Sequence, residues 1–317
     1  MKVCIVGAGA VGGLIGTRLA LAGAEVSALA RGETLHALRR EGWRLQQAGA
    51  LLTAPVVAHQ QAAALGAQDL VVVAVKAPAM SSVAQAIGPL LASNTVVLPA
   101  MNGVPWWFAD GLESVDPGGA IAAAIARSHV VGCVVHLSAA TAEPGLVVHK
   151  NGAGLIIGEP DGSSSPRLAA IHALLAKAGF DVTSSSAIRQ DIWYKLWGNL
   201  TMNPVSALTG ATGDRMLDDP LVRGFCSAAM REAAAIGAKI GCVIDQDPDA
   251  RHAVTRELGA FKTSMLVDAE RGRSIELDAI VTAVHELGKQ TGVPTPNIDA
   301  LLGLTRLYAR VRGLYPL

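Results

Sequence analysis

The chain has 317 residues, of which 51% are hydrophobic and 16% charged, and its 26 basic residues balance its 26 acidic ones. A chain of this length and apolar content can bury the cores of two domains and is not expected to be disordered. A net charge of zero, no run of about 18 apolar residues and no leader-like N-terminus argue against nucleic-acid binding, membrane spans and secretion.

The first predicted element is an apolar strand over residues 3–6, which leads directly into Gly7-x-Gly9-x-x-Gly12. A helical pattern follows, and a second strand over residues 25–30 completes a βαβ unit. In this context the glycines indicate a dinucleotide-binding turn. Gly7 allows the tight turn, Gly9 lets a pyrophosphate approach the backbone, and Gly12 lets the helix pack closely on the strand. A glycine-rich turn without a ligand is the less favoured alternative.

The end of the second strand bears on which dinucleotide is bound. NAD-binding turns carry an acidic residue about 20 positions after the glycines, but this strand is followed by Arg31. A guanidinium can pair with the 2′-phosphate of NADP, so Arg31 favours NADP over NAD. The alternative is that Arg31 is a solvated surface residue and that Glu25 or Glu33 binds the ribose of NAD.

Further strands are predicted over residues 70–75, 96–99, 130–137, 146–149, 155–158 and 181–183, with a helix over residues 167–178. Apolar strands separated by helices predict a mostly parallel sheet covered on both faces. The strands between residues 130 and 158 are too close together for helical crossovers, so we expect antiparallel hairpins attached to that sheet. Lys76 and Asn102 follow two strand ends and could flank the ribose and nicotinamide of a cofactor. A surface lysine and a turn-forming asparagine fit the pattern equally well.

From residue 188 onward the pattern is helical nearly throughout. The first of these helices carries Lys195, Asn199 and Asn203 at i, i+4 and i+8, which places them along one stripe of an otherwise apolar helix. Buried polar groups need partners, and a ligand in a cleft between the two domains would be one. A hydrogen-bond network between helices is an alternative, and Asn203 before Pro204 could simply mark a helix end.

Ser264 and Glu276 lie twelve residues apart, where we expect a helix end, a short turn and the start of the next helix. The four cysteines show neither metal nor disulfide spacing, as is typical of a cytoplasmic protein. The chain is therefore predicted to be an α/β Rossmann-type dinucleotide-binding domain followed by an all-helical domain. We expect NADP binding over residues 1–186 and substrate binding and catalysis over residues 187–317.

Taken together, these residues resemble the ketopantoate reductase (2-dehydropantoate 2-reductase) family over nearly the whole chain. The resemblance is carried by the glycine turn, Arg31, Val75-Lys76-Ala77, Asn102-Gly103, the segments 143–149 and 195–210, Ser264-Met-Leu-x-Asp268, Glu276-Leu-Asp278 and Gly292-Val-Pro-Thr-Pro296. The glycines alone would not be specific. The Lys-Asn-Asn-Pro segment combined with the spacing of Ser264 and Glu276 is specific.

The resemblance implies NADPH-dependent reduction of ketopantoate to pantoate, a step toward pantothenate. Positions matching the family's catalytic and substrate-binding residues are Lys195 as general acid and Asn102, Asn199, Asn203, Ser264 and Glu276 around the substrate. Positions matching its cofactor-binding residues are Gly7, Gly9, Gly12, Arg31, Lys76 and Asn102. Ser264 would lie near the substrate's carboxylate, and Glu276 would accept a hydrogen bond from its hydroxyl.

The sequence departs from the family pattern at three places. Met101 stands where Gln is common, Ile275 where Thr is usual, and Val281-Thr282 where Asn-Gly usually follows. The two latter changes make the neighbourhood of Glu276 more apolar. Reduction of a 2-oxo acid is therefore better founded than the identity of that acid.

Three hypotheses follow. The first is ketopantoate reduction. The second is a related reductase of another 2-oxo acid or a 3-hydroxyacid-type dehydrogenase, the latter disfavoured by Arg31 and by the Ser264/Glu276 pair. The third is a non-enzymatic NADP-binding sensor, which would not need Lys195. As partners we expect a small-molecule 2-oxo acid and neither metal, nucleic acid nor membrane, and a homodimer is left open.

Overall fold

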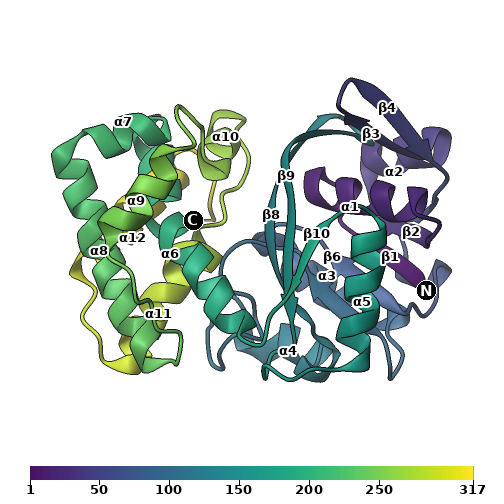
Figure 1. Ribbon diagram of the computed structural model, residues 1–317, viewed down its shortest axis with the longest axis horizontal. Coiled ribbons are helices and arrows are strands. Elements are labelled where there is room, and N and C mark those ends of the chain that lie inside the picture. The colour runs from purple at the N-terminus through teal and green to yellow at the C-terminus, as the bar shows by residue number, and fades with distance from the viewer. Residues whose placement is uncertain (317) are drawn as a thin grey trace. The chain divides into compact units, whose positions relative to one another are not determined.

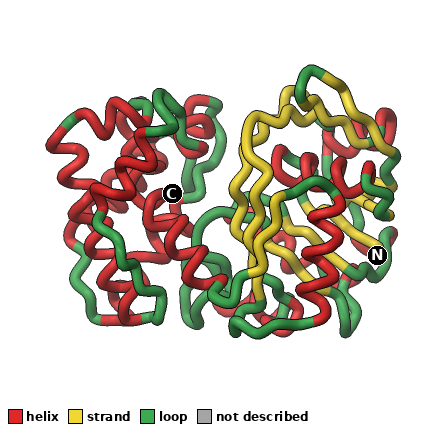
Figure 2. Tube along the Cα trace, viewed as in Figure 1, coloured by secondary structure: helices red, strands yellow, loops and turns green. Residues whose placement is uncertain are grey.

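The computed structural model describes residues 1–316. The chain forms two compact units, one made of Met1–Phe108 and Asp116–Arg189, the other of Ala109–Val115 and the residues from Gln190 onward. All strands belong to the first unit, and the second is built from helices (Figures 1 and 2). The expected class, a Rossmann-type α/β part followed by a helical part, is confirmed.

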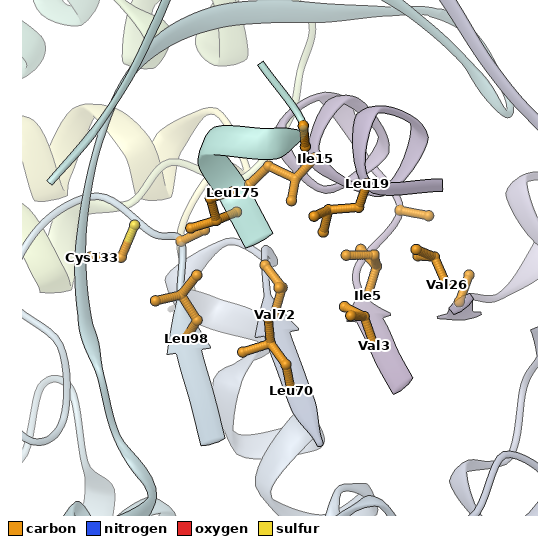
Figure 3. Packing of buried hydrophobic residues seen from close by; sticks show 14 of the residues in the cluster. Val3, Ile5, Ile15, Leu19, Val26, Leu70, Val72, Leu98, Cys133 and Leu175 are labelled. Carbon is orange, nitrogen blue, oxygen red and sulfur yellow. The ribbon is translucent and has the colours of Figure 1, made fainter. Parts of the chain in front are cut away.

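A five-stranded parallel sheet organises the first unit. Its order is β5 (Val57–His59), β2 (Glu25–Leu29), β1 (Lys2–Val6), β6 (Leu70–Val73) and β7 (Val96–Pro99). The central strands β1 and β6 are buried on both faces, which is why they read as unbroken apolar runs in the sequence. Helices α1 (Ala10–Leu21), α2 (Gly32–Glu41), α3 (Met80–Ala86), α4 (Ala120–Ala124) and α5 (Pro166–Lys177) belong to the same unit. In Figure 3, Ile15 and Leu19 of α1 and Leu175 of α5 lie over apolar side chains of the sheet.

A second sheet corrects one sequence expectation. The strands between residues 130 and 158 are not hairpins added to the parallel sheet. They form one long antiparallel hairpin, β8 (Gly132–Glu143) and β9 (Leu146–Gly158), within a sheet of order β10-β9-β3-β4. The remaining strands of this sheet are β3 (Trp43–Gln47), β4 (Ala50–Ala54) and β10 (Asp181–Ser184). An isolated parallel bridge joins Val97 of β7 to Val130, just before β8.

Helix α1 packs between the two sheets, which explains why most of its residues are small or apolar and buried. A side-chain carbon at Gly16 would lie within 3.0 Å of both Trp43 in β3 and Ile5 in β1, and one at Gly13 would lie 2.6 Å from Val147 in β9. Glycine at these positions therefore lets both sheets approach the helix that follows the glycine turn.

The second unit contains α6 (Ile188–Thr209), which begins at the end of the first unit, and then α7 (Gly213–Asp218), α8 (Pro220–Lys239), α9 (Pro248–Arg256), α10 (Ser264–Glu270), α11 (Ala283–Thr291) and α12 (Pro296–Val311). A π-helical turn, Asp278–Thr282, precedes α11. Side chains cap several helix starts: Asp219 accepts hydrogen bonds from the backbone N–H groups of Leu221 and Val222. Within residues 1–316, no helix has the length and apolar character needed to cross a bilayer.

Candidate functional site

The glycine turn between β1 and α1 has three different steric requirements. Gly7 has a φ of +94°, and a side chain there would also meet Val75. A Cβ at Gly12 would lie 2.1 Å from the carbonyl oxygen of Gly7, so α1 packs too closely against the turn for any side chain at this position. Around Gly9, the N-cap of α1, a Cβ would have no heavy atom within 4 Å. That open space lies at a helix N-terminus, where backbone N–H groups attract anions.

A pocket of about 280 Å³ opens at the carboxyl ends of β1 and β2 and beyond the end of β6. Its lining consists of Val6, Gly7, Ala8, Gly9, Leu29, Ala30, Arg31, Thr34, Val75, Ala79, Ser82, Val83 and Ala86. This is the edge at which parallel α/β sheets bind ligands. The pocket therefore brings together Gly7, Gly9 and Arg31, three of the residues expected to hold a dinucleotide.

Sequence reasoning missed Thr34 and Ser82, the hydroxyl side chains of this lining. Thr34 lies in the first turn of α2, three residues after Arg31. Residues three apart at a helix start lie on the same side, so this spacing could have indicated that Thr34 lines the same pocket as Arg31. Ser82 lies in α3, and its hydroxyl donates to the carbonyl of Ala79 at 2.9 Å. Nothing in the sequence around Ser82 distinguishes it from an ordinary helical serine.

The charged residues near the second strand have separate places. Arg31 is exposed and forms the N-cap of α2, where it lines the pocket. Glu25 is the first residue of β2, in register with Lys2 of β1. It is therefore at the wrong end of the strand to replace an acid at the carboxyl end. Glu33 is exposed and, in the described chain, does not line the pocket. Of these three charged residues, Arg31 is therefore the one that lines the pocket.

Lys76 and Asn102 lie at the same edge of the sheet. Val73 in β6 pairs with Pro99 in β7, and each of the two polar residues follows its strand partner by three positions. Both are partly buried. Lys76 follows Val75 and its carbonyl accepts from the N–H of Ala79 at 2.8 Å. In residues 1–316 neither side chain is part of the pocket lining, and Lys76 directly follows Val75, which is.

The polar stripe of the second unit is confirmed as a helical arrangement. Lys195 and Asn199 are partly buried, and Asn203 is only 5% exposed. Helix α6 continues through Pro204 to Thr209, so the suggestion that Asn203 marks a helix end is wrong. Pro204 lacks the N–H that would bond to the carbonyl four residues earlier, yet the helix persists because its apolar side is firmly packed.

Two tryptophans hold α6 on the side opposite the stripe. Trp193 and Trp197 are each about 1% exposed, and the indole N–H of Trp197 donates to the carbonyl of Met230 at 2.7 Å. At a period of 3.6 residues per turn these positions lie roughly across the helix from Lys195 and Asn199. The stripe is therefore carried by a helix whose rotation is fixed by its core.

The segment from Ser264 to Glu276 has the expected helix end, short turn and start of a further helix, since α10 ends at Glu270 and the next helical turn begins at Asp278. Ser264 is the first residue of α10, after the N-cap Thr263, whose hydroxyl accepts a hydrogen bond from the N–H of Leu266 at 3.2 Å. Glu276 is partly buried and precedes the π-helical turn, between the fully packed side chains of Ile275 and Leu277. Its position just before a helical segment agrees with the sequence expectation.

Other chemistries find little support in the described residues. Within residues 1–316, no group of three or more His, Cys, Asp or Glu side chains is placed to hold a metal ion. All four cysteines are buried and none forms a disulfide within residues 1–316, and burial raises the pKa of the Cys4 and Cys226 thiols to about 11. A thiol that stays protonated is a poor nucleophile, so Cys4 and Cys226 are structural.

Comparison with known proteins gives a consistent result. The family model described as ketopantoate reductase PanE/ApbA matches residues 3–162, and the one described as ketopantoate reductase PanE/ApbA C terminal matches residues 187–309. The chain is 43% identical to the 2-dehydropantoate 2-reductase of Mesorhizobium japonicum, covering 99% of this chain and 100% of that protein.

Solved structures agree. A crystal structure of a candidate ketopantoate reductase from Ralstonia solanacearum MolK2 is 60% identical with a TM-score of 0.96, covering 99% of each chain. D-Mandelate dehydrogenase, in a ternary structure with NADH and anilino(oxo)acetate, is 22% identical with a TM-score of 0.86, covering 99% of this chain and 100% of that one. At that identity the second likeness concerns the fold alone.

Proposed function

The chain belongs to the ketopantoate reductase family of oxidoreductases, and we propose that it reduces 2-dehydropantoate (ketopantoate) to pantoate with NADPH, a step toward pantothenate. The observation that carries this proposal is the stripe of Lys195, Asn199 and Asn203 on α6, in a chain similar over its whole length to a 2-dehydropantoate 2-reductase. A binding protein without a reaction to catalyse would have no use for an ammonium group in that stripe.

The first unit has the features that a nicotinamide dinucleotide requires. The open space at Gly9 and the N-terminus of α1 suit the pyrophosphate, and the pocket beside them suits the adenosine end. We propose that Arg31 pairs with the 2′-phosphate of NADP(H), because a guanidinium matches a phosphate bidentately and the described lining of this pocket holds no carboxylate that would repel it. Lys76 and Asn102 would lie near the ribose and nicotinamide. When bound, the dihydronicotinamide supplies the hydride for the 2-keto carbon.

The second unit would stabilise charge and transfer a proton. Negative charge develops on the keto oxygen as its carbon is reduced, and the ammonium of Lys195 would stabilise that charge and donate the proton. Asn199 and Asn203 would orient the substrate through their amides. Ser264, exposed at the start of α10, would donate to the substrate's carboxylate, and Asn102 would contribute a further polar contact.

We assign substrate selection to Glu276, which would accept a hydrogen bond from the primary hydroxyl of ketopantoate. A site built around such an acceptor rejects analogues that lack the hydroxyl, because the acceptor is left without its partner. The apolar departures Ile275 and Val281 weigh little against this assignment. Both are at most 1% exposed, so they belong to the core of the helical unit rather than to a surface that a substrate reaches.

The experiment compares ketopantoate with 2-ketoisovalerate, which lacks the hydroxyl, in the parent enzyme and in Glu276→Ala. The kcat/KM for ketopantoate should fall by about 10- to 150-fold, the equivalent of a hydrogen bond of about 1.5–3 kcal/mol to a charged group. The kcat/KM for 2-ketoisovalerate should change little. Glu270→Ala is the matched control, since Glu270 is an exposed carboxylate of α10 that pairs with Lys262. Equal losses with both substrates would contradict the role of Glu276.

We also place the enzyme in the cytoplasm, where its four buried thiols would stay reduced. A homodimer stays a prediction.

A further inference from the structure

The segment that follows α12 returns to the stretch of chain that carries Glu276. Helix α12 ends at Val311, and the N–H of Leu314 then bonds back to the carbonyl of Ala309 at 2.8 Å. The carbonyl of Leu314 in turn accepts from the N–H of Ile275 at 3.1 Å. Leu314 and Ile275 are 2% and 1% exposed. The residue immediately before Glu276 is therefore tied to the C-terminal segment by a buried backbone hydrogen bond.

The same segment holds the chain on the other side of Glu276. The hydroxyl of Tyr315 donates to Oδ1 of Asp278 at 2.6 Å, and the hydroxyl of Thr282 donates to the same oxygen at 3.0 Å. Asp278 opens the π-helical turn. Such turns are rare and often mark functional sites, because the extra residue in the turn redirects the side chains beside it. The Tyr315 hydroxyl thus fixes the start of that irregular turn two residues beyond Glu276.

Tyr315 is itself well held. The guanidinium of Arg310 lies 5.9 Å from the centre of the tyrosine ring, and its Nε donates to the carbonyl of Pro316 at 3.0 Å. Burial and the neighbouring Asp278 carboxylate raise the pKa of the Tyr315 phenol well above its usual range, with Arg310 and Arg306 acting weakly in the opposite direction. The phenol therefore stays a hydrogen-bond donor at any pH used to assay an enzyme.

We propose that Tyr315, acting through Asp278, is a positioning residue for Glu276, so that the C-terminal segment determines how well the enzyme binds the distal hydroxyl of its substrate. This inference rests on the proposed function, in which Glu276 accepts from that hydroxyl. Tyr315 does not touch the substrate in this account. It restrains the backbone on the C-terminal side of the acid, as the Leu314 carbonyl does on the N-terminal side.

The test is Tyr315→Phe, which removes the hydroxyl and keeps the ring. A misplacement of about 1 Å in a site can cost about 100-fold, so partial loosening of the turn should raise the KM for ketopantoate about tenfold. The kcat for ketopantoate and both constants for 2-ketoisovalerate should stay within about twofold of the parent values, because these do not depend on a contact to the hydroxyl. Tyr308→Phe is the matched control: this tyrosine of α12 lies under Arg312, and its hydroxyl makes none of these contacts.

A double variant separates a positioning role from a merely structural one. In the Glu276→Gln background, the added Tyr315→Phe change should have no further effect on KM, because the acid that it positions is already gone. Multiplicative effects of the two changes, or equal losses with both keto acids, would overturn the inference and leave the proposed function standing. Failure of the parent enzyme to reduce ketopantoate would instead overturn the proposed function, and this inference with it.

Discussion

Alanine substitutions at Gly9 and Gly12 should separate cofactor binding from stability, although the two glycines are only three residues apart. At Gly9 the backbone is extended, with φ −82° rather than the positive φ that strains a side chain, and an added Cβ meets nothing within 4 Å. We expect Gly9→Ala to change the free energy of unfolding by no more than about 1 kcal/mol, the usual range for an N-cap change. Its methyl group would, however, occupy the space proposed for the pyrophosphate.

At Gly12 the balance is reversed. The Cβ of an alanine would lie 2.1 Å from the Gly7 carbonyl oxygen and 3.0 Å from both Ala74 and Ile5. Carbon–oxygen contacts in proteins are normally about 3.3 Å or longer, so the helix or the turn must move by about 1 Å. Overpacking of this kind costs about 1–3 kcal/mol, and the better helix propensity of alanine returns at most about 1 kcal/mol. We therefore expect a net loss of about 1–2 kcal/mol in the free energy of unfolding.

The assays are urea denaturation of the ligand-free proteins and titration with NADPH followed by fluorescence. Gly9→Ala should unfold near the parent midpoint but bind NADPH about 10- to 150-fold more weakly, as expected for losing a charge-assisted contact of about 1.5–3 kcal/mol. Gly12→Ala should unfold at a lower urea concentration with an unchanged slope. Parent-like NADPH affinity in Gly9→Ala would refute the placement of the pyrophosphate. Parent-like stability in Gly12→Ala would refute the close packing of α1 against the turn.

Arg31→Ala should raise the KM for NADPH about 10- to 150-fold and leave the KM for NADH nearly unchanged, and equal kcat/KM values with the two cofactors in the parent enzyme would count against this role. Lys195→Ala should lower kcat about 10²- to 10⁴-fold with NADPH affinity preserved, whereas near-normal turnover would make this lysine structural. Burial alone would raise the pKa of Glu159, but hydrogen bonds from Arg167 and Ser165 outweigh it and hold that pKa below its ordinary value of 4.5. A lowered carboxyl pKa stabilises the fold above about pH 4.5, and this contribution is lost as the pH falls through the folded-state pKa. The free energy of unfolding, measured from about pH 6 to pH 3, should therefore fall as the pH is lowered. Glu159→Gln should make that fall smaller, and an equal fall in the variant would rule out the contribution of Glu159.

The parts of the fold that could be predicted from sequence are those with local signals. The glycine turn lies between a strand and a helix that are continuous with it in the chain. The helix over Ile188–Thr209 has a regular period, so the relative placement of Lys195, Asn199 and Asn203 followed directly. Arg31 could be placed because it comes right after a recognisable strand.

The parts that could not be predicted depend on residues far apart in the chain. Strand β3 forms a local hairpin with β4 but also pairs with β9, about a hundred residues away, and that second pairing, which places the hairpin in its sheet, had no local signal. The polar and glycine-rich residues 150–154 carry no strand pattern, so the sequence predicts two short strands where β9 runs through without a break by pairing with β8. Tyr315 hydrogen-bonds to Asp278, 37 positions earlier in the chain, and no periodic pattern in the sequence predicts such a contact.

The most direct test of the account is the substrate preference of the unmodified enzyme. Purified protein should be assayed for NADPH oxidation with ketopantoate, 2-ketoisovalerate and other 2-oxo acids at matched concentrations. The account predicts that kcat/KM is highest for ketopantoate and about 10- to 150-fold lower for 2-ketoisovalerate, because the Glu276 carboxylate loses its hydroxyl partner. If the hydroxyl-free acid is reduced as well as ketopantoate or better, the account is contradicted and a reductase of another 2-oxo acid becomes the better description.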